Sequence, residues 1–224
     1  MPVLPADAAA FIFDCDGTLV DSMDAWLSVW PDVAAEFGVP AVAADFDAYE
    51  HLSVEQECIE IHRDFGLRGS AEAFEARIRQ EMAERYRTRV RALSGVRAFL
   101  GQAAAAGIPM AVATSTSADL VVPCLEQNGI AAYFGAVVTT GMVGASKAEP
   151  IVYDRARELV APGVSRRDCW VFEDALFGLS TARRAGYHVV GIADPHRPDG
   201  AGRARALSEV FIESYAELSL SEVR

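Results

Sequence analysis

From residue 93 onward, short apolar runs alternate with segments that place apolar residues at helical spacing. Glycine follows several of the helical segments, as it does at helix ends. Regular alternation of this kind is typical of a parallel sheet covered by helices on both faces. The expected strands are 108–114, 136–139, 169–174, 187–192 and 210–212. The expected helices are 96–106, 118–128, 149–160 and 175–185, with a further helix at the C-terminus.

One more buried strand is expected near the N-terminus, where AAAFIFD spans residues 8–14. Residues 21–91 differ from the rest, because they are rich in Ala, Glu and Arg and carry apolar residues at helical spacing. About four helices are expected there, on the usual length of globular helices. The sequence thus predicts a doubly wound α/β core (1–19 and 93–224) with a helical module (20–92) inserted after its first strand.

Composition limits the kinds of partner. The chain has 224 residues, 51% apolar content and a formal net charge of -12, which argues against a nucleic-acid or anionic-membrane partner. A local positive site can still hold one small anion. No run approaches the roughly 18 apolar residues of a membrane span, and no charged segment precedes the first apolar run. The four scattered cysteines form no CxxC pair, so we expect reduced thiols in a cytoplasmic protein.

Acidic residues follow two of the expected strands. Asp14 and Asp16 come directly after the first, in FDCDGT, and Glu173 and Asp174 end another. In a parallel sheet these ends meet at one edge, where ligands bind. Four neighbouring acids require a hard cation with oxygen ligands, most naturally Mg²⁺. A solvated Asp-Gly turn is the ordinary alternative for DxDG alone.

Two further features suit a phosphate. Lys147 is the sole lysine beside 19 arginines, and a lone ammonium near acids and a phosphate can neutralise both. Thr114 ends an expected strand and is followed by Ser115 just before a helix, so hydroxyls and backbone N–H groups there can bind an anion. A surface lysine and an ordinary helix cap are the simpler alternatives.

Taken in order, FDCDGTLVDS, AGIPMAVATSTS, Lys147 with Pro150, and VFEDALFGLSTARRAG resemble the haloacid dehalogenase superfamily. They are similar to its branch with a helical cap after the first strand, which includes phosphoglycolate phosphatase-like enzymes and β-phosphoglucomutase. The resemblance covers nearly the whole chain. It departs at KAEP, where relatives usually carry proline directly after the lysine, and at Ala175, where serine is frequent.

The resemblance implies a role for each motif. Asp14 would be the nucleophile that forms an aspartyl-phosphate, and Asp16 the general acid and base. Lys147 would bridge Asp14 and the phosphate. The other implied contacts are to phosphate from Thr114, Ser115, Gly17 and Thr18, and to Mg²⁺ from Asp14, the Asp16 carbonyl, Asp174 and Glu173.

The implied reaction is hydrolysis of a small phosphorylated metabolite. The family's dehalogenases lack an acid where Asp16 stands, and its phosphonate-cleaving members use a cap lysine, whereas residues 20–92 contain none. A β-phosphoglucomutase-like sugar phosphomutase remains an alternative. The mutase carries a histidine where this chain has Trp26 and a cap arginine near Val54, where this chain has none. A non-catalytic metal-binding or regulatory module is a second alternative.

The substrate itself is not specified by these motifs. The cap residues Trp26, Trp30, His51 and Arg85 are candidates to face it, although core packing or solvent exposure is the more ordinary role of each. The sequence does not indicate an oligomeric state.

Overall fold

A computed structural model describes residues 2–39, 47–49 and 52–221 of the chain. Its centre is a six-stranded sheet in the order β4-β3-β2-β5-β6-β7, in which every neighbouring pair is parallel. This is the predicted doubly wound α/β architecture. The strands are β2 (Ala10–Phe13), β3 (Met110–Thr114), β4 (Ala136–Thr139), β5 (Cys169–Glu173), β6 (His188–Ile192) and β7 (Val210–Ile212).

Helices cover both faces of this sheet. They are α4 (Val96–Ala105), α5 (Ala118–Gln127), α6 (Thr140–Val143), α7 (Ile151–Val160), α8 (Leu176–Ala185) and α9 (Ala201–Leu207). Because side chains alternate along a strand, Phe11 and Phe13 pack with α4 and α5 on one face. Ala10 and Ile12 pack with α7, α8 and α9 on the other. The larger cluster is aromatic at its centre, where the rings of Phe13 and Phe172 stack at 4.2 Å.

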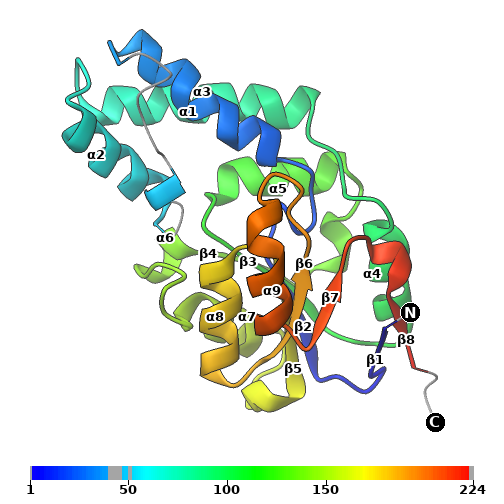
Figure 1. The fold of residues 1–224 in the computed structure, drawn as a ribbon. Helices are drawn as coiled ribbons and strands as arrows, with labels where there is room; N and C mark the ends of the chain where they lie inside the picture. The colour runs from blue at the N-terminus through cyan, green and yellow to red at the C-terminus, as the bar shows by residue number, and fades with distance from the viewer. Residues whose placement is uncertain (1, 40–46, 50–51, 222–224) are drawn as a thin grey trace.

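The inserted segment lies at one end of the sheet in Figure 1 and contributes no strand to it in the described residues. It contains α1 (Met23–Glu36), α2 (Val54–Phe65), α3 (Ala71–Thr88) and a 3-10 turn at Asp47–Tyr49. The described part thus holds three of the roughly four helices expected there. Left-handed Gly66 (φ 61°) ends α2, and the Ser70 side chain caps α3.

The chain crosses into and out of this segment at two adjacent points. Asp21 N donates to Arg91 O (2.8 Å), and Leu93 N donates to Leu19 O (3.0 Å). Val20 and Ala92 form an antiparallel bridge between these two contacts. The two crossings therefore lie side by side, next to the strand end that carries Asp14.

The C-terminal segment differs from the predicted helix, and that prediction is wrong. In place of a terminal helix, Tyr215–Glu217 forms a 3-10 turn and Ser219–Leu220 forms β8, which pairs in parallel with β1 (Val3–Leu4). Both residues of β8 are half-buried, and Leu218, just before them, is buried. Helix α9 was not expected at all.

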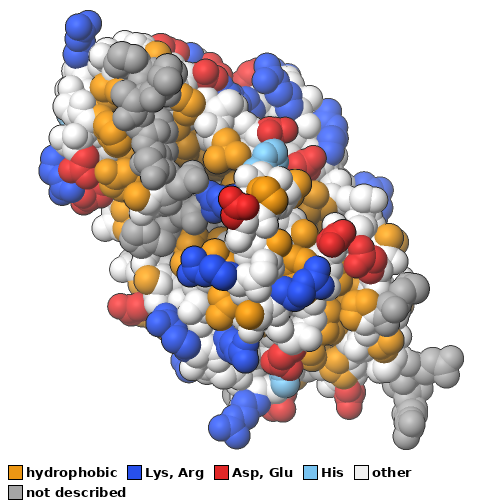
Figure 2. Space-filling model, in the orientation of Figure 1, with side chains coloured by type: hydrophobic (Ala, Val, Ile, Leu, Met, Phe, Trp, Pro, Cys, Tyr) orange, Lys and Arg blue, Asp and Glu red, His pale blue; other side chains and the backbone are white. Residues whose placement is uncertain are grey.

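On the face drawn in Figure 2, basic, acidic and apolar side chains are interspersed. Elsewhere on the core, His188 Nδ1 lies 2.7 Å from Glu209 Oε2. Among the residues that the structure describes, no helix is long and apolar enough to cross a membrane.

Candidate active site

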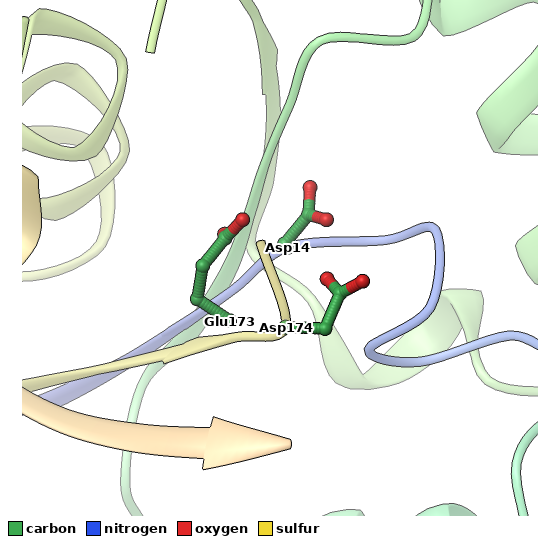
Figure 3. Close-up of side chains that lie close together, drawn as sticks. All are labelled: Asp14, Glu173 and Asp174. Carbon is green, nitrogen blue, oxygen red and sulfur yellow. The ribbon is translucent and has the colours of Figure 1, made fainter. Parts of the chain in front are cut away.

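Three neighbouring strands end at the same edge of the sheet, and each end carries polar side chains. Asp14 follows β2, Thr114 is the last residue of β3, and Glu173 with Asp174 ends β5. The loop between α6 and α7 brings Lys147 to the same place. Figure 3 shows the carboxyl groups of Asp14, Glu173 and Asp174 gathered beyond the strand ends. Residues far apart in sequence therefore form one cluster.

Lys147 lies between two of these acids. Its Nζ is 2.5 Å from Asp14 Oδ1 and 2.9 Å from Glu173 Oε2, and the side chain is only 2% exposed. Tyr153 Oη donates to the same Glu173 oxygen at 3.4 Å. Burial alone lowers the pKa of Lys147, but the charges of Asp14 and Glu173 outweigh it and hold that pKa well above its ordinary value. The ammonium therefore keeps its proton at neutral pH.

One ammonium does not balance three buried carboxylates. Burial raises the pKa of Asp14, although Lys147 opposes that shift. Burial, and then the charge of Asp14, raise the pKa of Glu173 well above its ordinary range and that of Asp174 to about 8. These directions mean that the cluster carries more negative charge than its own side chains stabilise.

The arrangement fits a divalent cation. Asp14, Glu173 and Asp174 each offer a carboxylate oxygen, and these atoms lie within 4.8 Å of one another. Glu173 Oε1 is buried and has no hydrogen-bond partner among the described residues. Carboxylate oxygens are the ligands that hard divalent cations prefer. The Asp16 carboxylate lies outside this group, so any contribution from Asp16 would come from its backbone carbonyl.

Two glycines allow the acids to sit this close to the chain. Gly17 has φ 73°, and a Cβ there would lie 2.3 Å from Asp174 Oδ2. A Cβ on Gly178, inside α8, would lie 2.5 Å from Glu173 Oε1. Thr18, for which substrate binding is predicted, is fully buried, and its hydroxyl donates to Asp174 Oδ1 at 3.0 Å, so its side chain orients an acid of the cluster.

The segment after β3 supplies hydroxyl groups. Thr114 is 1% exposed, and its Oγ1 accepts from Thr116 N at 3.1 Å. Ser115 Oγ is buried without a hydrogen-bond partner in the described part of the chain. A buried hydroxyl without a partner is costly, and a bound anion would satisfy it. The segment is therefore suited to hold phosphate oxygens.

Asp16 is held by three side-chain hydroxyls that sequence reasoning did not identify. Ser22 Oγ donates to Asp16 Oδ1 at 2.6 Å, and Tyr86 Oη donates to the same oxygen. Thr116 Oγ1 donates to Asp16 Oδ2 at 2.8 Å. Burial raises the pKa of Tyr86 well above its ordinary value, so its phenol keeps its proton. Ser22, at the end of FDCDGTLVDS, and Thr116, in the TSTS run, lay in motifs that the sequence singled out, whereas Tyr86 did not.

A pocket of about 360 Å³ opens over the cluster. Its core side is mainly polar and includes Asp14, Asp16, Thr114, Ser115, Thr116, Lys147, Glu173, Asp174 and Arg197, together with Ala175 and Phe177. Its cap side is largely apolar among the described residues and includes Met23, Trp26, Leu27, Trp30, Pro31, Leu52 and Val54, with Glu57 as the charged exception. The pocket thus has a polar end and an apolar wall.

The cap candidates divide into three groups. Trp26 and Trp30 line the pocket, with ring centroids 6.0 Å apart. Arg85 does not line it, because its guanidinium is directed at the Ala25 carbonyl (2.9 Å) and Asp32 (2.8 Å) within the cap. His51 lies outside the described residues.

Comparison with known proteins agrees with this geometry. A family model described as haloacid dehalogenase-like hydrolase matches residues 8–186. Hexitol phosphatase A of Escherichia coli is 30% identical over 83% of this chain and 83% of its own length. Fructose-1-phosphate phosphatase YqaB of the same organism is 27% identical over 82% of this chain and 96% of its own length.

The fold agrees as well. The crystal structure of CbbY from Rhodobacter sphaeroides in complex with phosphate superposes with a TM-score of 0.75 and 20% identity, over 94% of this chain and 96% of that one. The family match includes the strand ends that carry Asp14, Thr114 and Glu173, and the relatives are phosphatases. The chain therefore belongs to the haloacid dehalogenase-like hydrolases, as a phosphoric monoester hydrolase of that family.

Proposed function

We propose that this protein is a Mg²⁺-dependent phosphatase that hydrolyses a small phosphorylated metabolite through a phosphoaspartyl intermediate on Asp14. The observation that carries the proposal is the position of Asp14. Its carboxylate is buried at a strand end, contacts Lys147 at 2.5 Å, and lines the same pocket as the Thr114 and Ser115 hydroxyls. A nucleophile, a cation and anion-binding groups thus share one polar surface.

In the first step, a carboxylate oxygen of Asp14 attacks the phosphorus atom. The new O–P bond forms as the bond to the substrate's leaving oxygen breaks, and Asp16 gives a proton to that oxygen. Lys147 neutralises charge on Asp14 and on the transferring group. Thr114 and Ser115 hold phosphate oxygens, so the chain contributes mainly positioning and charge stabilisation.

In the second step, water attacks the phosphorus of the phosphoaspartate. Asp16, now ionised, accepts a proton from that water, and the bond between phosphorus and the Asp14 oxygen breaks. Inorganic phosphate leaves and both aspartates return to their starting states. The same carboxyl thus serves as acid and then as base.

Asp14, Asp174 and the Asp16 carbonyl would hold Mg²⁺, with Glu173 beside it. When bound, the ion supplies positive charge that screens the carboxylates and favours approach of an anionic phosphate. The raised pKa values of Asp14 and Asp174 without such a charge support this assignment.

The relatives suggest where to begin with substrates, since two of them are named for hexitol phosphates and fructose 1-phosphate. Trp26 and Val54 line the pocket at the positions where a mutase would carry histidine and arginine. Neither of these two side chains can bind a second phosphate, which favours hydrolysis over transfer within a bisphosphate, while the arginine that does line the pocket, Arg197, lies on the core.

The test is a panel of sorbitol 6-phosphate, fructose 1-phosphate, β-glucose 1-phosphate and phosphoglycolate, assayed for phosphate release with and without Mg²⁺. We expect metal-dependent release from at least one of these. Asp14→Asn should abolish turnover with the fold intact, because an amide is no nucleophile. Asp16→Asn should retain slow phosphorylation of Asp14, with turnover lowered by about 100- to 10,000-fold.

Intact-mass spectrometry supplies the decisive readout. Asp16→Asn mixed with substrate should gain the mass of one phosphoryl group, and the Asp14→Asn/Asp16→Asn double variant should not. Equal turnover in wild type and Asp14→Asn would refute the mechanism. Conversion of β-glucose 1-phosphate to glucose 6-phosphate faster than phosphate release would instead identify a mutase.

A further inference from the structure

The acid Asp16 is not held by the core alone. Its Oδ1 accepts from Tyr86, which lies on α3 in the inserted segment, and from Ser22, which lies at the first crossing. Its Oδ2 accepts from Thr116 in the core. Two donors on one oxygen restrict that oxygen, whereas the other oxygen, with Thr116 as its donor, keeps more acceptor capacity. Asp16 and Thr116 both line the pocket.

Tyr86 is itself fixed at both ends. Its hydroxyl accepts from Trp26 Nε1 at 3.0 Å, and its backbone carbonyl accepts from Gln127 Nε2 of α5 at 3.1 Å. Its ring is 3% exposed and packs edge-to-face against Trp26. The tyrosine therefore links a tryptophan of the pocket wall, a core helix and the Asp16 carboxylate.

We propose that Tyr86 is a positioning residue of this hydrolase: it fixes Asp16 Oδ1 so that Oδ2 is the oxygen that exchanges a proton with the leaving group. This inference rests on the proposed function, in which Asp16 is the general acid. Tyr86 does not line the pocket, so it acts through Asp16 and not on the substrate.

The effect of losing this positioning should depend on the leaving group of the substrate. A sugar alkoxide is a strong base and leaves only as it is protonated, so its release depends on where Asp16 stands. A nitrophenolate is a weak base and leaves without a proton. Misplacing the acid should therefore slow phosphorylation of Asp14, which kcat/KM reports, for the alkyl monoester and spare it for p-nitrophenyl phosphate. Attack of water on the phosphoaspartate also uses Asp16 but is common to both substrates, so kcat does not separate them.

The experiment compares wild type with Tyr86→Phe, which removes the hydroxyl and keeps the ring. Substrates are p-nitrophenyl phosphate and the panel ester that wild type hydrolyses fastest. For the alkyl ester we expect kcat/KM to fall on the order of tenfold or more, as part of the effect of a whole proton transfer. For p-nitrophenyl phosphate we expect kcat/KM to change within about twofold.

Tyr215→Phe is the matched control. Tyr215 is also buried, and its hydroxyl has no hydrogen-bond partner among the described residues. This variant should leave both rates unchanged. Ser22→Ala removes the other donor to Oδ1 and should shift the ratio of the two rates in the same direction, which keeps the test usable if Tyr86→Phe unfolds.

Two results would overturn the inference. One is an equal loss on both substrates in folded Tyr86→Phe and Ser22→Ala, which would mark a general structural role. The other is no loss on either. Neither result touches the proposed function, which fails separately if wild type shows no turnover that depends on Asp14.

Discussion

Lys147 is enclosed so tightly that its shape, as well as its charge, should matter. Its Nζ lies 2.5 Å from Asp14 and 2.9 Å from Glu173, and 5.7 Å from the centre of the Tyr153 ring. A compact ammonium fits between two carboxylates, whereas a planar guanidinium needs a wider gap. The chain uses arginine at all of its other 19 Lys and Arg positions.

We therefore predict that Lys147→Arg costs nearly as much activity as Lys147→Ala. The expected loss is about 100- to 1,000-fold in kcat/KM, the range for an electrostatic contact in a water-poor site. Steady-state kinetics with saturating Mg²⁺ would measure it. Surface Arg89→Lys is the control and should retain full activity. If Lys147→Arg keeps most of the wild-type rate, charge alone is sufficient and the shape argument is wrong.

The residues of the site differ in how far sequence could identify them. Asp14, Thr114 and Asp174 were predictable because parallel strands end at one edge, so position along the chain fixes position in space. No comparable rule predicts which residues of the inserted helices face the site. Arg85 was a candidate, yet its neighbour Tyr86 contacts Asp16, because one helical step turns a side chain by about 100°. Only packing of α3 against the core decides which residue faces the acid.

At the level of elements, α8 carries a glycine where helices usually do better without one. Gly178 lies against the Glu173 side chain, and a Cβ on Gly178 would be 2.5 Å from the carboxyl group of Glu173. Gly101 in α4 is the matched case, because the nearest atom to a Cβ there is Tyr133 Oη at 3.7 Å. The two helical glycines thus differ in whether the surrounding residues leave room for a Cβ.

We predict opposite effects of alanine at the two positions. Gly101→Ala should raise the free energy of unfolding by about 1 kcal/mol, the usual helix-propensity gain. Gly178→Ala should lower it by about 1–3 kcal/mol, because the buried Glu173 carboxylate must shift. Urea denaturation of both variants would measure the difference. Stabilisation of both by similar amounts would show that Glu173 moves freely and that the close approach has no cost.

The strands of the main sheet were well predicted because each is short and buried. Each expected strand was a short apolar run, and each is buried in the structure at least on one side. The prediction for the C-terminal segment was wrong because a helix and a strand of only a few residues can have the same amino-acid composition, so composition does not distinguish them. Its state is decided by pairing between β8 and β1, which lie more than two hundred residues apart in sequence.

At the scale of the whole molecule, the four cysteines report whether reagents can reach the core of the native protein. All four are buried and unpaired. Burial raises the pKa of Cys124 to about 12 and of Cys169 to about 11, and it raises those of Cys15 and Cys58 as well. Because only the thiolate reacts, thiols whose pKa exceeds the ambient pH stay unreactive.

We predict that a thiol reagent at pH 8 labels none of the four in the native protein within minutes and all four after unfolding. The same shifts have a defined sign for stability. The contribution of the protonated thiols is fully present below the unfolded pKa of about 8.5 and is lost as pH rises towards the folded values. Rapid labelling of any thiol in the folded protein would show that the core opens locally at that place.

The paired crossings at Leu19–Asp21 and Arg91–Leu93 bear on how this architecture could arise and change. Because the chain leaves the core and returns to it at adjacent points, the inserted segment is equivalent to a loop whose two ends are held together. The closure entropy of a loop grows only logarithmically, so each doubling of its length costs about 0.6 kcal/mol. A segment of roughly 70 residues thus adds only about 2 kcal/mol over one of a few residues. The catalytic strand ends can therefore keep their geometry while the inserted helices are lengthened, exchanged or diversified, and substrate range can evolve separately from the chemistry.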